Sequence, residues 1–131
     1  MTATTLLAVA ALHVAWGRGS TFPFASADEL AERVVGSRRV PSPLACNVIA
    51  GLLGSGAILV TVRPRWAIHR TALRAMAAVL ATRAAFGFAG RTDLLVPGSD
   101  SAAFRRRDRS TYAPLCAALA AGTLTATRRS A

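Results

Sequence analysis

The chain is a strongly basic and apolar sequence of 131 residues, which is enough for one domain over residues 1–131. Hydrophobic residues make up 53% of the chain, and its mean hydropathy is +0.40 although its formal charge is +10. Arginine supplies all 16 basic residues, and they are not interleaved with stacking aromatic side chains. This composition argues against a single-strand nucleic-acid binder, so we expect no nucleic-acid partner.

Residues 2–17 form the first predicted membrane span. This range has no charged side chain, and its one ionisable residue, His13, lies close to its end. A helix of this length covers roughly 24 Å, less than the roughly 30 Å of hydrocarbon in a bilayer, so it needs local thinning or support from neighbouring helices. We expect a span rather than a cleaved signal peptide, because no positively charged segment precedes the apolar run.

A polar connection with a short amphipathic segment follows the first span. Ser26 is placed to cap a helix that continues through Val35, and Leu30 and Val34 fall at helical spacing within it. The mixed charges around these apolar positions are typical of a helix that lies on the membrane surface or caps a bundle. A solvated loop is the alternative.

Residues 44–62 give the strongest prediction of a membrane span. They contain no charged side chain and are preceded by Pro41 and Pro43. Glycines at 51, 54 and 56, together with Ser55, predict a small-residue face on which another helix can approach closely.

Residues 70–90 form a third predicted span, which is unusual because it contains arginine. Arg70 and Arg74 lie near its beginning, where long side chains reach the lipid head groups. Arg83 lies well inside the span. A lone guanidinium at membrane depth costs a few kcal/mol at least, so we expect Arg83 to face the other helices and find an acidic partner.

The fourth predicted span covers residues 111–127 and follows a connection rich in arginine, with Asp93, Asp100 and Asp108. The predicted fold is therefore an all-α, four-helix transmembrane bundle with a short amphipathic segment between its first two helices, located in the cell membrane as a multi-pass protein. Nine arginines lie in the two longer connections, whereas five lie beside the termini and in residues 63–70. By the positive-inside rule, this difference places both termini outside.

Several short motifs carry a resemblance to a known family. They are His13-Val-Ala-Trp16-Gly17, Pro41-Ser-Pro43, Arg83 followed by Phe86-Gly87-Phe88, and Asp108 followed by Tyr112-Ala-Pro-Leu115. With these motifs, over nearly its whole length, the chain resembles the DUF3995 family of small bacterial four-helix integral membrane proteins. The resemblance implies the architecture and no particular activity.

The polar residues at the ends of the first, third and fourth spans form one candidate site. These three ends lie on the same side of a four-span chain. We predict His13, Asp108 and Tyr112 as candidate catalytic residues, and Trp16, Arg83 and Phe86 as candidate substrate-binding residues. An Arg83–Asp108 pair would neutralise the buried cation, and His13 would serve as a proton donor or acceptor. Several of these residues also have a structural interpretation. His13 would be an interfacial hydrogen-bonding histidine, and Asp108 would form a local salt bridge or cap a helix. Tyr112 and Trp16 would be interfacial aromatic side chains.

Three functions fit the sequence. The first is an integral membrane protein of unassigned activity with a structural or accessory role. The second is a small membrane enzyme, cyclase-like or isomerase-like, that applies acid/base chemistry to a hydrophobic or isoprenoid-like substrate. The third is a lipid-binding or partner-binding membrane subunit. An enzyme would enclose an apolar pocket beside His13, Arg83 and Asp108, whereas an accessory subunit would expose its small-residue face.

The lipid bilayer is the partner that the sequence predicts directly, and the oligomeric state is left open. We predict no metal site and no cofactor, because His69 and His13 lie at opposite ends of the bundle. Cys46 and Cys116 lie in separate apolar runs, and we expect free thiols unless the two positions face each other.

Overall fold

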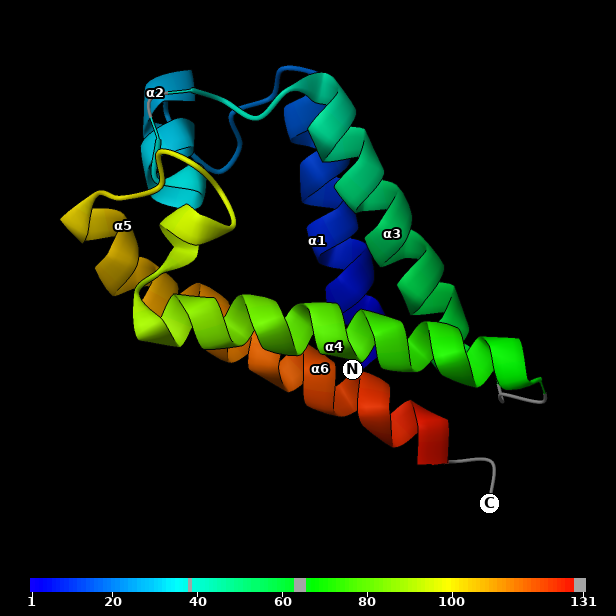
Figure 1. The fold of residues 1–131 in the computed structure, drawn as a ribbon. Coiled ribbons are helices and arrows are strands. Elements are labelled where there is room, and N and C mark those ends of the chain that lie inside the picture. Colours follow the sequence, from blue (N-terminus) through cyan, green and yellow to red (C-terminus); the bar gives the residue numbers. More distant parts are fainter. Residues whose placement is uncertain (38, 63–65, 129–131) are drawn as a thin grey trace.

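The fold is all-α, as predicted. The computed structural model describes residues 1–37, 39–62 and 66–128, and these ranges contain helices and no strand. Four long helices follow the four predicted ranges closely (Figure 1): α1 Thr2–Gly17, α3 Pro43–Thr61, α4 Ala67–Ala89 and α6 Ala113–Arg128. Shorter helical segments connect them: α2 Ala27–Leu30, η1 Ala31–Val35, η2 Thr92–Leu94, α5 Ala102–Arg107 and η3 Asp108–Tyr112.

The ends of the helices follow from local sequence. Ser42 caps α3 by accepting a hydrogen bond from the Ala45 backbone nitrogen at 3.2 Å, and Pro43 occupies the first helical position. Ser26 caps α2 in the same way, as predicted. Gly90 ends α4 with a φ of +68°, a conformation that glycine adopts without a steric penalty.

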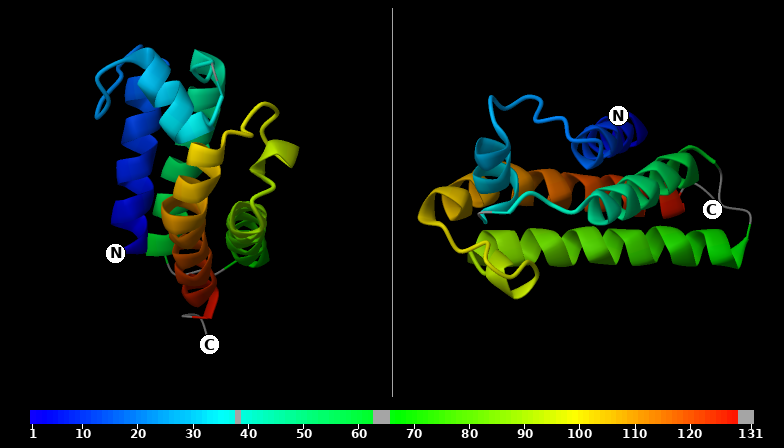
Figure 2. Two further views of the ribbon diagram at one scale, coloured as in Figure 1. Left: turned by 90° about the vertical axis from the view of Figure 1, so that its left-hand side faces the viewer. Right: turned by 90° about the horizontal axis from the view of Figure 1, so that it is seen from above.

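The long helices pack as two antiparallel pairs that cross steeply (Figures 1 and 2). α1 lies along α3, and α4 lies along α6, whereas contacts between the pairs are few. The pairs meet in one apolar cluster that contains Leu6, Ala57, Leu73 and Leu119. The structure therefore has crossed pairs where we predicted a single four-helix bundle.

The polar connections explain why the pairs diverge. Residues 20–37 and 91–112, which we call the polar cap, pack against each other at the end of the molecule away from that apolar cluster. Phe104 of α5 is buried against Gly36, which follows η1, and the Tyr112 hydroxyl donates to the Arg33 carbonyl at 2.8 Å. The amphipathic segment thus covers the ends of α1 and α3, where Leu30 packs with Trp16. Because the polar cap lies between the ends of the pairs, the long helices are held apart there.

Only part of the predicted small-residue face is used for packing. A side chain at Gly51 or Gly54 would meet no atom within 4 Å, so α3 is open at both positions in the part of the chain that the structure describes. Gly56 instead lies directly against Met76 of α4. The close approach of a neighbouring helix on this face is therefore limited to Gly56.

Candidate functional site

A buried ion pair joins α4 to the start of the last helix. The guanidinium of Arg83 contacts both carboxylate oxygens of Asp108, with Nη2 to Oδ1 at 2.7 Å and Nη1 to Oδ2 at 3.2 Å. The Thr92 hydroxyl of η2 donates to the same carboxylate. The Asp108 side chain is only 1% exposed, and that of Arg83 is 26% exposed. Three elements, α4, η2 and η3, therefore meet at one carboxylate, and the predicted Arg83–Asp108 pair is present.

A glycine one helical turn after Arg83 makes room for this contact. A Cβ atom on Gly87 would lie 2.7 Å from the Ala113 Cβ and 2.9 Å from the Arg83 Nη1. Gly87 and Arg83 share a face of α4 because positions four apart are neighbours on a helix. The absence of a side chain at Gly87 therefore lets the start of α6 and the Asp108 carboxylate approach α4.

The geometry of the cluster favours a structural role for Asp108. An ionised carboxylate is an acceptor only, and both oxygens of Asp108 already accept hydrogen bonds. Bidentate arginine–carboxylate pairs are among the strongest hydrogen-bonded contacts in proteins. Across the described residues, every buried side-chain nitrogen and oxygen has a hydrogen-bond partner. The cluster is thus suited to hold three segments in register.

Two other predicted site residues lie on the same side of the molecule as this pair. Tyr112 ends η3, one turn after Asp108, and its ring centroid lies 6.3 Å from that of Phe104 in the polar cap. Phe86 lies on α4, three residues after Arg83, and its carbonyl accepts from the Arg91 backbone nitrogen where α4 ends. Their catalytic and substrate-binding roles stay predictions.

His13 and Trp16 belong to a different cluster, on the α1–α3 pair. The His13 Nδ1 donates to the Val9 carbonyl at 2.9 Å, and its ring centroid lies 5.0 Å from that of Trp16. The Trp16 Nε1 donates to the Phe22 carbonyl at 2.7 Å, and its side chain packs beside Cys46. The structure gives both residues local partners and records no hydrogen bond or ion pair between His13 and the Arg83–Asp108 pair among the described residues. Their functional roles also stay predictions.

Sequence reasoning missed two parts of this region. Thr92 follows the predicted third span in a polar connection, and nothing in its local pattern marks it as a partner of Asp108. Arg105 and Arg109, which flank Asp108 in sequence, line a pocket with Gly90, and their i, i+4 spacing was the signal for a shared helix face. Cys46 and Cys116 are free thiols, one in each helix pair.

These observations define a class of small helical protein in which two crossed helix pairs are joined through a polar cap and a buried arginine–aspartate–threonine cluster. The chain belongs to the family described as protein of unknown function (DUF3995), whose sequence model matches residues 6–123. This match confirms the resemblance seen in the motifs. No curated protein and no solved structure matches the chain. The matched range contains Arg83, Thr92 and Asp108, so the cluster lies within the family's domain.

Proposed function

We propose that this protein is a multi-pass integral membrane protein of the cell membrane, with a structural or accessory role. The outward surface of α3 and α4 carries this proposal. Leu52 and Ile58 on α3 are 68% and 64% exposed, and Ile68 and Val79 on α4 are 77% and 68% exposed. Extended apolar surfaces of this kind are rare on soluble monomers, and lipid chains would cover them.

The lengths of the helices support the same proposal. α3 has 19 residues and α4 has 23, and both are long and apolar enough to cross a membrane. α1 and α6 have 16 residues each and are shorter than a bilayer's hydrocarbon core. α1 packs along α3, and α6 packs along α4. We therefore propose that all four helices cross the membrane and that the bilayer thins beside α1 and α6.

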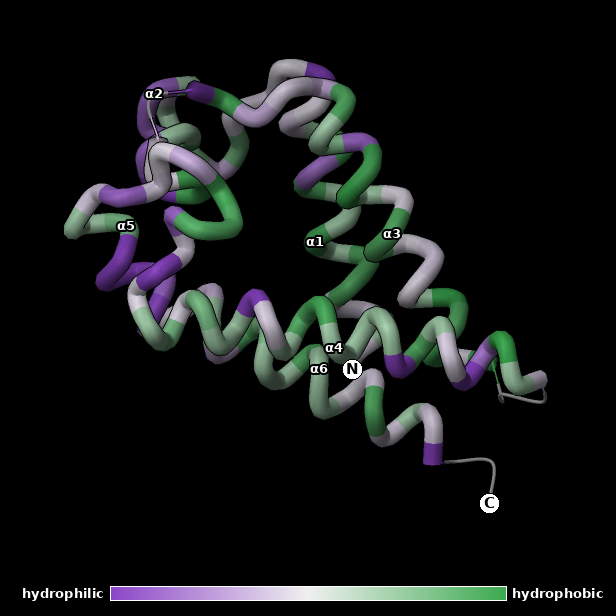
Figure 3. Tube along the Cα trace, in the orientation of Figure 1, coloured by the Kyte–Doolittle hydropathy of each residue, from purple (hydrophilic) through white to green (hydrophobic). Residues whose placement is uncertain are grey.

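The placement of polar residues fits one membrane surface at the polar cap. The cap connects the last residues of α1 and α4 to the first residues of α3 and α6, and hydrophilic residues gather there (Figure 3). Arg70 and Arg74, near the opposite end of α4, are exposed and long enough to reach head groups. Arg83, the remaining arginine of α4, is neutralised by Asp108. Each charged side chain of α4 can thus be accommodated in a bilayer, either at the head groups or in an ion pair.

The Asp108 carboxylate is 1% exposed and already accepts from Arg83 and Thr92. This favours the structural or accessory role over acid/base catalysis, because a catalytic carboxyl must reach a substrate and exchange a proton with it. The open face of α3 also favours an accessory role. Gly51, Gly54 and Ser55 lie on an unpacked part of that helix, where a helix of another membrane protein would fit closely.

Cysteine accessibility in membrane vesicles tests the proposed location. In a Cys46→Ala/Cys116→Ala background, single cysteines are introduced by Leu52→Cys, Val79→Cys and, as the matched control in the polar cap, Thr111→Cys. We expect a water-soluble maleimide to label the Thr111→Cys variant readily, and the Leu52→Cys and Val79→Cys variants only after detergent is added. Rapid labelling of all three in intact vesicles, with release of the protein by alkaline carbonate, would overturn the proposal.

A further inference from the structure

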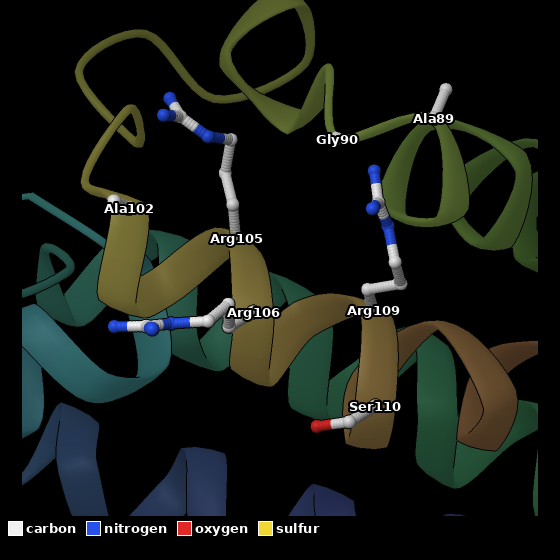
Figure 4. Close-up of a pocket in the computed structure, with 7 residues that line it drawn as sticks. All are labelled: Ala89, Gly90, Ala102, Arg105, Arg106, Arg109 and Ser110. Atoms are coloured by element: carbon white, nitrogen blue, oxygen red, sulfur yellow. The ribbon is translucent and has the colours of Figure 1, made fainter.

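A basic pocket of about 610 Å³ lies between the end of α4 and the helical segments α5 and η3. One part of its lining is the end of α4, with Ala89 and Gly90. The other part comes from α5 and η3, with Ala102, Arg105, Arg106, Arg109 and Ser110. Figure 4 shows Arg109 rising from its helical segment towards the chain around Ala89 and Gly90, with Arg105 rising beside it. The residues that line the pocket do not include Arg83 or Asp108, whose carboxylate is buried in the same segment.

Two of the three guanidinium groups are held in place by backbone carbonyls. The Arg109 Nε donates to the Phe88 carbonyl at 3.0 Å, in the last turn of α4, and the Arg105 Nη1 donates to the Asp100 carbonyl. A cation at this position is stabilised by the negative end of the α4 dipole. Since each guanidinium has five N–H groups, these bonds orient it and leave most of its donors for a ligand.

Gly90 is part of the pocket's construction. Its positive φ ends α4, and a Cβ at this position would lie 3.1 Å from the Arg109 Nη2 and 3.7 Å from the Arg105 Cδ. A Cβ here would therefore crowd Arg109 and be in ordinary contact with Arg105. The turn at Gly90 thus keeps the two guanidinium groups close to the end of the helix.

The positive charge in the pocket is not balanced by the protein. No carboxylate lines the pocket. Asp108, the acidic residue between the arginines in sequence, is 1% exposed and already paired with Arg83. Within the described ranges, no ion pair involves Arg105, Arg106 or Arg109. Guanidinium groups without a counter-charge, such as the three that line this pocket, are donors that recognise the oxygens of a phosphoryl group.

We propose that this pocket binds a phosphoryl group, and that its source is the head group of an anionic phospholipid. The lipid source rests on the proposed membrane location. It is favoured by exposed apolar side chains immediately before and after the α4 end of the pocket: Phe88, Leu94, Leu95 and Val96. An anionic head group beside apolar side chains is the arrangement that a lipid at the membrane interface presents.

Binding of short-chain lipids to the full-length protein in neutral detergent tests this proposal. The probes are dioctanoyl phosphatidylglycerol, dioctanoyl phosphatidylcholine and glycerol 3-phosphate, each measured by isothermal titration calorimetry. We expect phosphatidylglycerol to bind more tightly than the other two probes. The Arg105→Gln/Arg109→Gln variant should weaken its binding about tenfold or more, since one lost charge-assisted contact corresponds to roughly that factor.

The control removes the same charge elsewhere. Arg70 and Arg74 are also four residues apart and exposed, but they lie at the other end of α4. Arg70→Gln/Arg74→Gln should change phosphatidylglycerol binding by less than about twofold, because only long-range charge is altered and it is screened by salt. Equal weakening by both double variants would overturn the pocket as the site.

A further variant separates binding from folding. Arg106 lines the pocket without a recorded hydrogen bond to the described residues, so Arg106→Gln should weaken binding and leave the thermal unfolding temperature unchanged. Unchanged binding in Arg106→Gln and in Arg105→Gln/Arg109→Gln would refute the proposal.

The probes also separate this proposal from the proposed membrane location. If phosphatidylcholine binds as tightly as phosphatidylglycerol, the anionic-lipid site is wrong even when cysteine accessibility confirms membrane insertion. If glycerol 3-phosphate matches phosphatidylglycerol and depends on the same arginines, the ligand is a soluble phosphate ester and the lipid source is wrong. A failure of membrane insertion appears in the cysteine-labelling experiment alone.

Discussion

Arg83 and Asp108 lie 25 positions apart in sequence and form a two-point ion pair that is almost completely withdrawn from solvent at its acidic side. Arg83 projects from the second half of α4, and Asp108 begins η3, which leads directly into α6. The pair therefore sets how the last helix starts against α4. In the proposed membrane location, the pair would also neutralise an arginine placed at membrane depth.

Replacing Asp108 by asparagine should destabilise the protein strongly. Asp108→Asn keeps the shape of the side chain but leaves the Arg83 guanidinium without a counter-charge in a buried site. We expect a loss of about 3–5 kcal/mol, the range seen when one partner of a buried ion pair is removed. Thermal unfolding in detergent, followed by circular dichroism, measures the change.

The double variant Arg83→Met/Asp108→Leu is the control for this prediction. Because it removes both charges, it should be more stable than Asp108→Asn alone. If the double variant instead shows the sum of the losses measured in the single variants Arg83→Met and Asp108→Leu, Arg83 and Asp108 are not coupled.

A methyl group at Gly87 should disturb the contact between α4 and the start of α6. Gly87→Ala places a Cβ 2.7 Å from that of Ala113, so the two segments must separate. We expect a destabilisation of about 1–3 kcal/mol, typical of overpacking. Gly54→Ala is the matched control within a helix, since its Cβ meets no atom within 4 Å. That change should be neutral or stabilise by up to about 1 kcal/mol through helix propensity, and an equal loss in both variants contradicts the prediction.

The Tyr112 hydroxyl should contribute modestly to the closure of the polar cap. Tyr112→Phe removes the donor to the Arg33 carbonyl and keeps the ring beside Phe104. We expect a loss of about 0.5–1.5 kcal/mol, the usual net value of one hydrogen bond. Faster hydrogen exchange in residues 27–35, with α6 unchanged, is the corresponding local signature. Exchange that is the same in both proteins contradicts the role given to this bond.

Truncation of Phe104 should open the polar cap while leaving the long helices paired. The side chain is 2% exposed and packs on Gly36. Phe104→Ala should cost about 3–5 kcal/mol, as for other buried phenylalanines. Limited trypsin digestion should then cut within the cap. Phe22→Ala is the control, because Phe22 is 68% exposed and its truncation should change stability by less than about 0.5 kcal/mol.

The positions of α1, α3 and α6 were predictable from sequence because uncharged apolar runs are bounded by arginine, glycine and proline, and α4 was predictable from its apolar stretch despite its three arginines. α4 begins three residues earlier than predicted, at Ala67, because Arg70 and Arg74 remain exposed on the helix and do not interrupt it. The crossing of the pairs was not predictable. It depends on contacts such as Phe104 with Gly36, which join distant segments whose local patterns carry no mark of the contact.

The candidate site was predictable only where electrostatics restricted the choice. A buried Arg83 requires a carboxylate, and among the six acidic residues Asp108 lies at the beginning of the helix that returns beside it. His13 was placed with them because its helix ends on the same side. α1 packs instead on α3, and the polar cap separates the ends of the two pairs, so helix order alone was too coarse to place His13.

The pairing of helices that follow one another in sequence predicts an order of assembly during synthesis. α1 and α3 both lie within residues 1–62, so this hairpin is complete before α4 leaves the ribosome. α4 and α6 then form a second hairpin from the remaining sequence, and contacts of low sequence separation form quickly. The bond from Tyr112 to Arg33 spans 79 positions and needs both hairpins. We therefore expect each hairpin to form as its own unit, and the polar cap, which joins the two hairpins, to close last.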